Sequence, residues 1–181
     1  EGVNLITGLK EKNIAGLGRE IDFTINTSSR NTIYNFGIVE PYIFNKKLNL
    51  IYGINYQERD NSSSSSYNIN QFTTNLGFKY ELTEDIDHTS TIDYSMKEYE
   101  VTDADTASSS VKKQEGKNTE ITFNNRLVYD KLDSFMRPTD GTYLNYLNNI
   151  SPITNSTNGI FKNTFLFKKY LTIKKNVFSI Q

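Results

Sequence analysis

The chain contains no cysteine and no tryptophan, and it has 1 histidine and 3 prolines in 181 residues. Without cysteine it can form no disulfide scaffold, no thiolate metal site and no cysteine nucleophile. The single histidine, His88, argues against a histidine metal centre and against a Ser-His-Asp triad, and we expect it to be a solvated turn residue. The sequence therefore predicts no catalytic residue, no metal site and no cofactor, and we expect that the protein is not an enzyme.

An excess of positive charge is also missing, because 20 Lys and Arg face 21 Asp and Glu. Nucleic-acid binders need such an excess for phosphate contacts, so no nucleic-acid partner is expected. No apolar run approaches the ~18 residues of a transmembrane helix. What the chain does have is 12 Tyr and 11 Phe at a mean hydropathy of −0.57, which is typical of a sheet with one polar and one apolar face.

Apolar and polar residues alternate along most of the chain, which is the period of a β-strand. In one run, for example, Phe72, Leu76 and Phe78 share a face opposite Asn75 and Lys79. The clearest runs are 20–26, 48–57, 71–82, 120–129 and 161–172, and weaker ones are 3–12, 33–43, 90–101 and 142–150. Val177 begins a further run, and no stretch predicts a helix. We expect an all-β chain of about nine strands and the start of a tenth.

The strong runs are about ten residues long, whereas soluble strands usually have about 5–6 residues. A tilted strand that crosses a bilayer needs about 9–11. The connections alternate between mostly short ones beside apolar residues (13–18, 45–47, 83–87, 131–141, 174–176) and polar, serine-rich, often longer ones (27–31, 59–67, 102–117, 151–159). This alternation favours an antiparallel up-and-down transmembrane β-barrel, with turns at one end and loops at the other. A soluble antiparallel sheet with one buried face would show the same alternation along its strands.

In such a barrel the apolar face meets lipid and the polar face lines the lumen. The candidates for charged lumen-facing residues are Glu40, Lys79, Glu120 and Arg126. The candidates for an aromatic girdle near the strand ends are Tyr42, Phe44, Tyr129, Phe135 and Tyr170. None of these residues is expected to form a chemical site.

The run Pro138-Thr139-Asp140-Gly141 predicts a tight turn between two strands. Proline presets φ, aspartate can bond its own backbone, and glycine supplies a positive φ.

Three segments, in this order and spacing, resemble the barrel domain of the BamA family, the central subunits of the outer-membrane barrel-assembly machinery. They are E-K-N-I-A-G-L-G-R-E-I at 11–21, F-G-I-V-E-P-Y-I-F-N-K-K-L-N-L at 36–50 and L-V-Y-D-K-L-D-S-F-M-R-P-T-D-G-T-Y-L at 127–144. The third is the most specific, and in the family it lies at a periplasmic turn. The residues that we assign to structural turn motifs on this basis are Gly16, Gly18, Pro41, Tyr42, Asp130, Asp133, Pro138, Asp140 and Gly141.

The resemblance implies a sixteen-stranded barrel preceded by periplasmic POTRA repeats. Residues 1–181 would then be an incomplete barrel domain of about strands 2 to 11, with the POTRA repeats, the C-terminal strands and an Arg-Gly-Phe loop outside the chain. It also implies a function: folding and inserting β-barrel proteins into the bacterial outer membrane, without ATP. The implied partners are the lipid bilayer, unfolded outer-membrane proteins and accessory assembly lipoproteins, and the implied location is that of an integral outer-membrane barrel.

Other functions remain open at this point. A two-partner secretion translocator or a TamA-like factor would share the barrel and the repeats. A passive porin-type channel would also be a barrel, but it would usually gather opposed charges at a constriction. A soluble β-rich adhesin would need shorter strands.

Overall fold

The computed structural model describes residues 3–155, 159–174 and 176–180. They form one antiparallel sheet of ten strands in chain order, with each strand paired to the next. The strands are β1 (Asn4–Ile14), β2 (Arg19–Ser28), β3 (Asn31–Glu40), β4 (Leu48–Asp60), β5 (Tyr67–Thr83), β6 (Ile86–Val101), β7 (Gly116–Leu132), β8 (Gly141–Thr154), β9 (Ile160–Ile173) and β10 (Asn176–Ile180). The up-and-down all-β prediction, with a tenth strand beginning near Val177, is confirmed.

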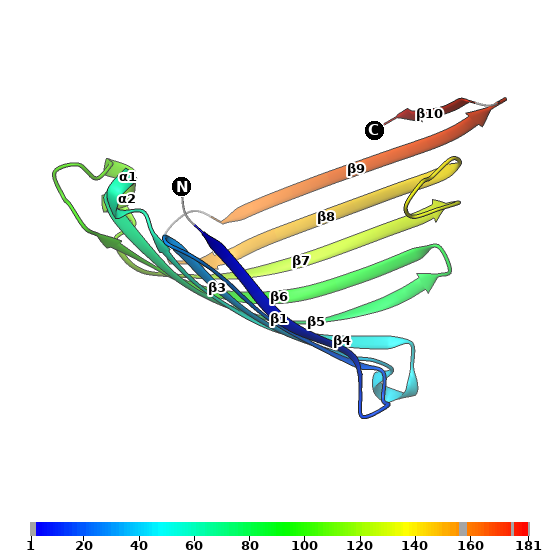
Figure 1. The fold of residues 1–181 in the computed structure, drawn as a ribbon, viewed down its shortest axis with the longest axis horizontal. Helices are drawn as coiled ribbons and strands as arrows, with labels where there is room; N and C mark the ends of the chain where they lie inside the picture. The colour runs from blue at the N-terminus through cyan, green and yellow to red at the C-terminus, as the bar shows by residue number, and fades with distance from the viewer. Residues whose placement is uncertain (1–2, 156–158, 175, 181) are drawn as a thin grey trace.

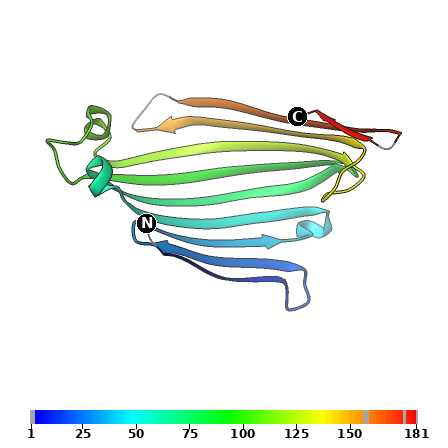
Figure 2. The same cartoon turned by 45° about the horizontal axis from the view of Figure 1, so that its top comes forward.

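The sheet is strongly curved, and its edge strands β1 and β10 are not paired with each other in the described part of the chain (Figure 1). Figure 2 shows the strands side by side in one open sheet, with the N-terminal β1 (blue) along one edge and β10 (red) along the other. The predicted weak run 33–43 extends past the end of β3 at Glu40, because Tyr42 adopts the left-handed conformation and the strand cannot continue. Positions 156–158 and 175 of two predicted connections lie outside the described residues.

Register between neighbouring strands sorts the side chains into two faces. Asn55 pairs with Thr73, which pairs with Ser95, whereas Leu50 pairs with Phe78 in an apolar row. The polar residues are mostly half-buried and the apolar ones more exposed, as expected for the concave and convex sides of a curved sheet. We call these the inner face and the outer face.

The connections gather at two ends. The turn end carries 15–18, 41–47, 84–85 and 133–140, and the loop end carries 29–30, 61–66, 102–115 and the described parts of 155–159. Two turn-end connections, 41–47 and 133–140, are longer than the loop-end turn 29–30, so the expected sorting by length holds for only part of the connections. These two turn-end connections are long because each has ordered internal structure of its own.

Short helices interrupt two of the loops. They are α1 (Ser62–Ser65) and α2 (Ser109–Lys113), and a 3-10 turn, η1, covers Ile43–Asn45. The expectation that no stretch is helical is wrong for these segments, because single helical turns carry no periodicity for a pattern to reveal. The two loops bond to each other through Thr102 N–H and Ser66 C=O at 2.9 Å. Among the described residues, no helix has the length and apolarity to cross a membrane.

Gly141 begins β8 at a position where a side chain does not fit. Its φ is +114°, and a Cβ there would lie 2.0 Å from the carbonyl oxygen of Lys131 in the paired strand β7. Gly16 also has a positive φ, +74°, but the space around it is open. The two glycines therefore separate the cost of backbone conformation from the cost of a steric clash.

Gly141→Ala is expected to destabilise the folded barrel more than Gly16→Ala. The Gly16 variant should cost roughly 1–2 kcal/mol, the penalty of a left-handed residue with a Cβ. The Gly141 variant adds the backbone clash. The free energy of unfolding in urea, followed by the gel mobility of the folded full-length protein in detergent, measures both. Equal losses for the two variants would contradict this account.

Candidate functional site: the inner wall, the outer face and the turn end

The segment 133–140 is a loop closed by a single carboxylate. Asp133 Oδ1 accepts from Thr139 N–H at 2.8 Å, and Asp133 Oδ2 accepts from the Thr139 hydroxyl. The backbone N–H of Asp133 donates to Asp140 C=O at 3.1 Å. The predicted tight turn at 138–141 is therefore wrong: Pro138 and Asp140 form one arm of a larger loop.

The pKa of Asp133 is lowered from 3.8 to about 2, chiefly because the Thr139 hydroxyl bonds to its charged form. Backbone N–H groups, including that of Thr139, add to this effect. Asp130 lies at the base of the same loop, where its carboxylate accepts from Leu132 N–H at 3.2 Å. The Thr172 hydroxyl donates to Thr139 C=O at 2.8 Å, which ties the loop to β9.

The other assigned turn residues are geometric as well. Gly16 and Gly18 both have positive φ in the β1–β2 turn, and Gly18 N–H donates to Asn13 Oδ1 at 2.7 Å. Tyr42 follows Pro41 with φ 55°, and Phe44 has φ 56°. A positive φ is a strained conformation for an aromatic residue.

Three of the predicted girdle residues lie in turn-end connections rather than in strands. Tyr42, Phe44 and Phe135 are strongly exposed, Phe135 by 92%. Tyr129 and Tyr170 lie within β7 and β9 and are half-buried. The exposed aromatic rings therefore project from the turn end beyond the sheet itself.

Ion pairs gather at the turn end. All four that the described residues form lie there: Arg19–Glu40, Lys47–Glu81 at 3.4 Å, Lys79–Asp87 at 3.0 Å and Lys131–Asp85 at 3.4 Å. Each joins neighbouring strands or turns. Exposed pairs of this kind contribute little stability but favour one register over another.

Glu40 is not a lumen-facing residue, in contrast to the prediction. It pairs with Leu50, whose row continues to Phe78 on the outer face, and its carboxylate meets Arg19 Nε. It is the last residue of β3, so its charge lies at the edge of the apolar face. Weak alternation near Pro41 concealed this orientation, and the sequence gave no signal for Arg19 as the partner.

The other three candidates lie on the inner face. Lys79 and Arg126 both pair with Thr89, and Glu120 pairs with Ser95. Lys79 binds Asp87, and Arg126 Nε donates to Asn145 Oδ1 at 3.1 Å. They are spread over the wall and do not form one cluster.

The prediction that His88 is a turn residue is wrong, because His88 lies within a strand. It lies in β6 on the outer face, and its Nδ1 is 2.8 Å from the hydroxyl of Tyr80. The two rings meet edge to face, with centroids 5.1 Å apart. The half-buried pair is an outer-face contact near the turn end.

The inner wall has a recess of about 220 Å³ at two facing glycines, Gly37 and Gly53. The carboxylate of Asp22 and the amide of Asn75 lie over them: a Cβ on Gly37 would be 2.5 Å from Asp22 Oδ1, and one on Gly53 would be 2.8 Å from Asn75 Nδ2. Of the described residues that line this recess, Asp22 is the only one with a formal charge.

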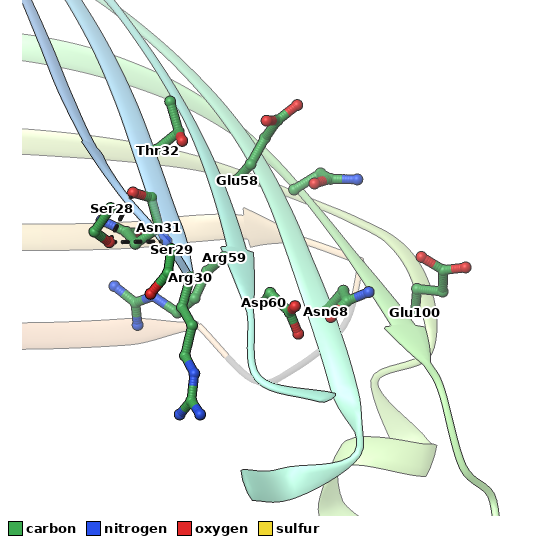
Figure 3. Close-up of a pocket in the computed structure, with 11 residues that line it drawn as sticks. Ser28, Ser29, Arg30, Asn31, Thr32, Glu58, Arg59, Asp60, Asn68 and Glu100 are labelled. Carbon is green, nitrogen blue, oxygen red and sulfur yellow. Dashed lines mark hydrogen bonds between the residues drawn. The ribbon is translucent and has the colours of Figure 1, made fainter. Parts of the chain in front are cut away.

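A second hollow, of about 310 Å³, lies at the loop end between the β2–β3 turn and β4, β5 and β6 (Figure 3). Arg30 and Arg59 extend on one side of it, and Glu58 and Glu100 on the other. Charges of both signs line an open surface, so the hollow does not define one ligand. Within the described ranges, no group of three or more His, Asp or Glu side chains could hold a metal ion.

These features define a class of protein. Nine of the ten described strands have ten or more residues, and they form an up-and-down meander with an apolar convex face and a polar concave wall. This combination is that of an outer-membrane β-barrel. The model of the Omp85 superfamily domain matches residues 13–181, so the chain belongs to the Omp85 superfamily.

The fold is that of a BamA-type barrel. Among solved structures, the chain is similar to BamA from Haemophilus ducreyi lacking POTRA domains 1-3, with a TM-score of 0.72 and 16% sequence identity. The match covers 93% of this chain and 36% of that one, so the chain spans about a third of that structure's length. No curated protein matches the chain.

Protonation of Asp133 is expected to loosen the loop 133–140. Because its folded pKa is lowered, its stabilising effect is complete above the unfolded value of 3.8 and is lost as the pH falls toward about 2. Pepsin, which is active in this range and cleaves beside aromatic residues, should cut at the exposed Phe135 only near pH 2. In Asp133→Asn the cut should already be fast at pH 4.

Thr139→Val supplies the matched control, since it removes the hydroxyl donor and keeps the carboxylate. It should shift the onset of cleavage to a higher pH than in the unchanged protein. Cleavage of an unfolded reference peptide corrects for the pH dependence of pepsin itself. A cleavage rate at Phe135 that is the same in all three proteins would show that Asp133 does not close the loop.

Proposed function

We propose that this chain is part of an outer-membrane assembly factor that folds and inserts β-barrel proteins into the bacterial outer membrane. The observation that carries the proposal is the Omp85 superfamily match over residues 13–181, together with the BamA-type fold. The proposal assumes that proteins of this superfamily with a BamA-type barrel use that barrel to insert other β-barrel proteins into the membrane.

In this proposal the chain acts by geometry and not as an enzyme. The outer face, with Leu76 and Phe78 among its exposed residues, contacts the lipid bilayer. The inner wall of short amides and hydroxyls, such as Asn55 and Thr73, faces water. Its partners are the bilayer, unfolded outer-membrane proteins and accessory assembly lipoproteins, and it needs no cofactor.

The turn end is the side that would face the periplasm, where unfolded clients arrive. The loop closed by Asp133 and the ion pairs at this end, such as Lys79–Asp87 between β5 and β6, hold neighbouring strands in register and stiffen the rim. A stiff rim supports the proposal because an assembly factor must keep its own strands in register beside unfolded strands that could pair with them.

Depletion of the full-length protein tests the proposal. With the gene under a repressible promoter, the amounts of folded β-barrel proteins in the outer membrane are measured by gel mobility and mass spectrometry. The proposal predicts that unrelated barrel proteins all decline together, while outer-membrane lipoproteins without a barrel remain.

Two outcomes would overturn it. If barrel proteins stay constant while one secreted protein is retained in the periplasm, the chain is part of a translocator of the same superfamily. If barrel proteins stay constant and only the permeability to small solutes falls, it is part of a passive channel.

A further inference from the structure

One row of polar side chains interrupts the outer face. Ser90, Asn125, Asn148 and Asn163 are direct cross-strand neighbours on β6, β7, β8 and β9, which lie side by side in Figure 1. We call these four residues the outer polar row. No single strand reveals the row, because its members become neighbours only through the register between the strands.

Apolar side chains flank the outer polar row on both sides. Toward the loop end the neighbouring row is Ile92, Phe123, Ile150 and Phe161. Toward the turn end it is Leu127, Tyr146 and Phe165, with the polar His88 at its β6 end. The row therefore runs within the apolar band and does not lie at its edge. Amides and hydroxyls that face hydrocarbon are costly unless they find partners.

Internal hydrogen bonds satisfy only part of the row. Ser90 Oγ donates to Asn125 Oδ1 at 3.0 Å, and Asn148 Nδ2 donates to Asn163 Oδ1 at 2.9 Å. The hydroxyl of Tyr146 donates to the same oxygen of Asn163 at 2.8 Å. The amide nitrogens of Asn125 and Asn163 have no bond to any other described residue, so they are donors that remain available to an external acceptor.

The row also crosses the sheet from one end toward the other. Ser90 lies near Ile86, where β6 leaves the turn end, and Asn163 lies near Ile160, where β9 leaves the loop end. Asn148 lies midway along β8 and is only 9% exposed. Because barrel strands are tilted by about 35–45°, a row perpendicular to them climbs obliquely across the bilayer.

We propose that the outer polar row is a path for phospholipid headgroups, along which the barrel speeds the movement of phospholipids between the two leaflets. A phosphate or an ester carbonyl accepts hydrogen bonds and would take them from the free amide donors of Asn125 and Asn163. The row carries no formal charge, so a headgroup can leave each position as readily as it arrives. This inference rests on the outer face meeting lipid and not on the assembly of other proteins.

The test uses the full-length protein reconstituted into phosphatidylethanolamine–phosphatidylglycerol vesicles with a trace of fluorescently labelled phospholipid. Dithionite destroys the label in the outer leaflet only, so loss of the remaining fluorescence reports transfer between leaflets. No unfolded client is present, and failure of this proposal is therefore distinct from failure of the proposed function. The unchanged protein is expected to transfer lipid severalfold faster than protein-free vesicles.

The variant Asn125→Leu/Asn163→Leu removes the two free donors and leaves the less exposed Asn148 in place. Its transfer rate should fall to that of protein-free vesicles. The matched control is Asn124→Leu/Asn149→Leu, which changes two amides that are cross-strand neighbours on the inner face of β7 and β8. The control should keep the full rate.

Gel mobility establishes that each variant is folded, and the single variant Asn163→Leu provides a milder change if the double variant does not fold. The proposal is overturned if the unchanged protein transfers lipid no faster than empty vesicles. It is also overturned if the outer-face and inner-face variants lose the same fraction of the rate. A full rate in the outer-face variant, with a membrane protein cross-linked at position 163, would reassign the row to a protein contact.

Discussion

Every strand of this chain pairs with the next one in an antiparallel ladder, and in such a ladder successive side chains point to opposite faces. Each residue is therefore committed to lipid or to water by the parity of its position and by the register of its strand. A slip by one residue would turn a whole strand inside out. The remaining features of the structure maintain that register.

The two ends maintain it by different means. At the turn end, ion pairs such as Lys79–Asp87 and the carboxylate cap of Asp133 join neighbouring strands and close the connections. At the loop end, neutral bonds perform this role, as between Asp60 N–H and Arg30 C=O at 2.8 Å and between Asn155 N–H and Thr119 C=O at 3.2 Å. Bonds of both kinds run from one hairpin to the next, so the meander is held as one sheet.

Alternation in the sequence was sufficient to predict the strands, since the period of two is a local property of each run. It failed where the controlling contact is not local. Glu40 was assigned to the wrong face because its run weakens beside Pro41, and the tight turn at 138–141 was wrong because Asp133 reaches across the loop to Thr139. The alignment of polar side chains in the outer polar row could not be predicted, because Asn125 and Asn148 become neighbours only through the register of β7 and β8.

The commitment of alternate residues to lipid and water can be measured directly, because the chain has no cysteine of its own. Single cysteines placed in turn at positions 72 to 76, 78 and 79 of β5, in the membrane-embedded full-length protein, would be challenged with a charged, membrane-impermeant thiol reagent. Position 77 is left out because a Cβ on Gly77 would lie 2.2 Å from the carbonyl oxygen of Ser90. The account predicts rapid labelling at positions 73, 75 and 79, which face the inner wall, and slow labelling at 72, 74, 76 and 78. Labelling without a period of two would contradict it.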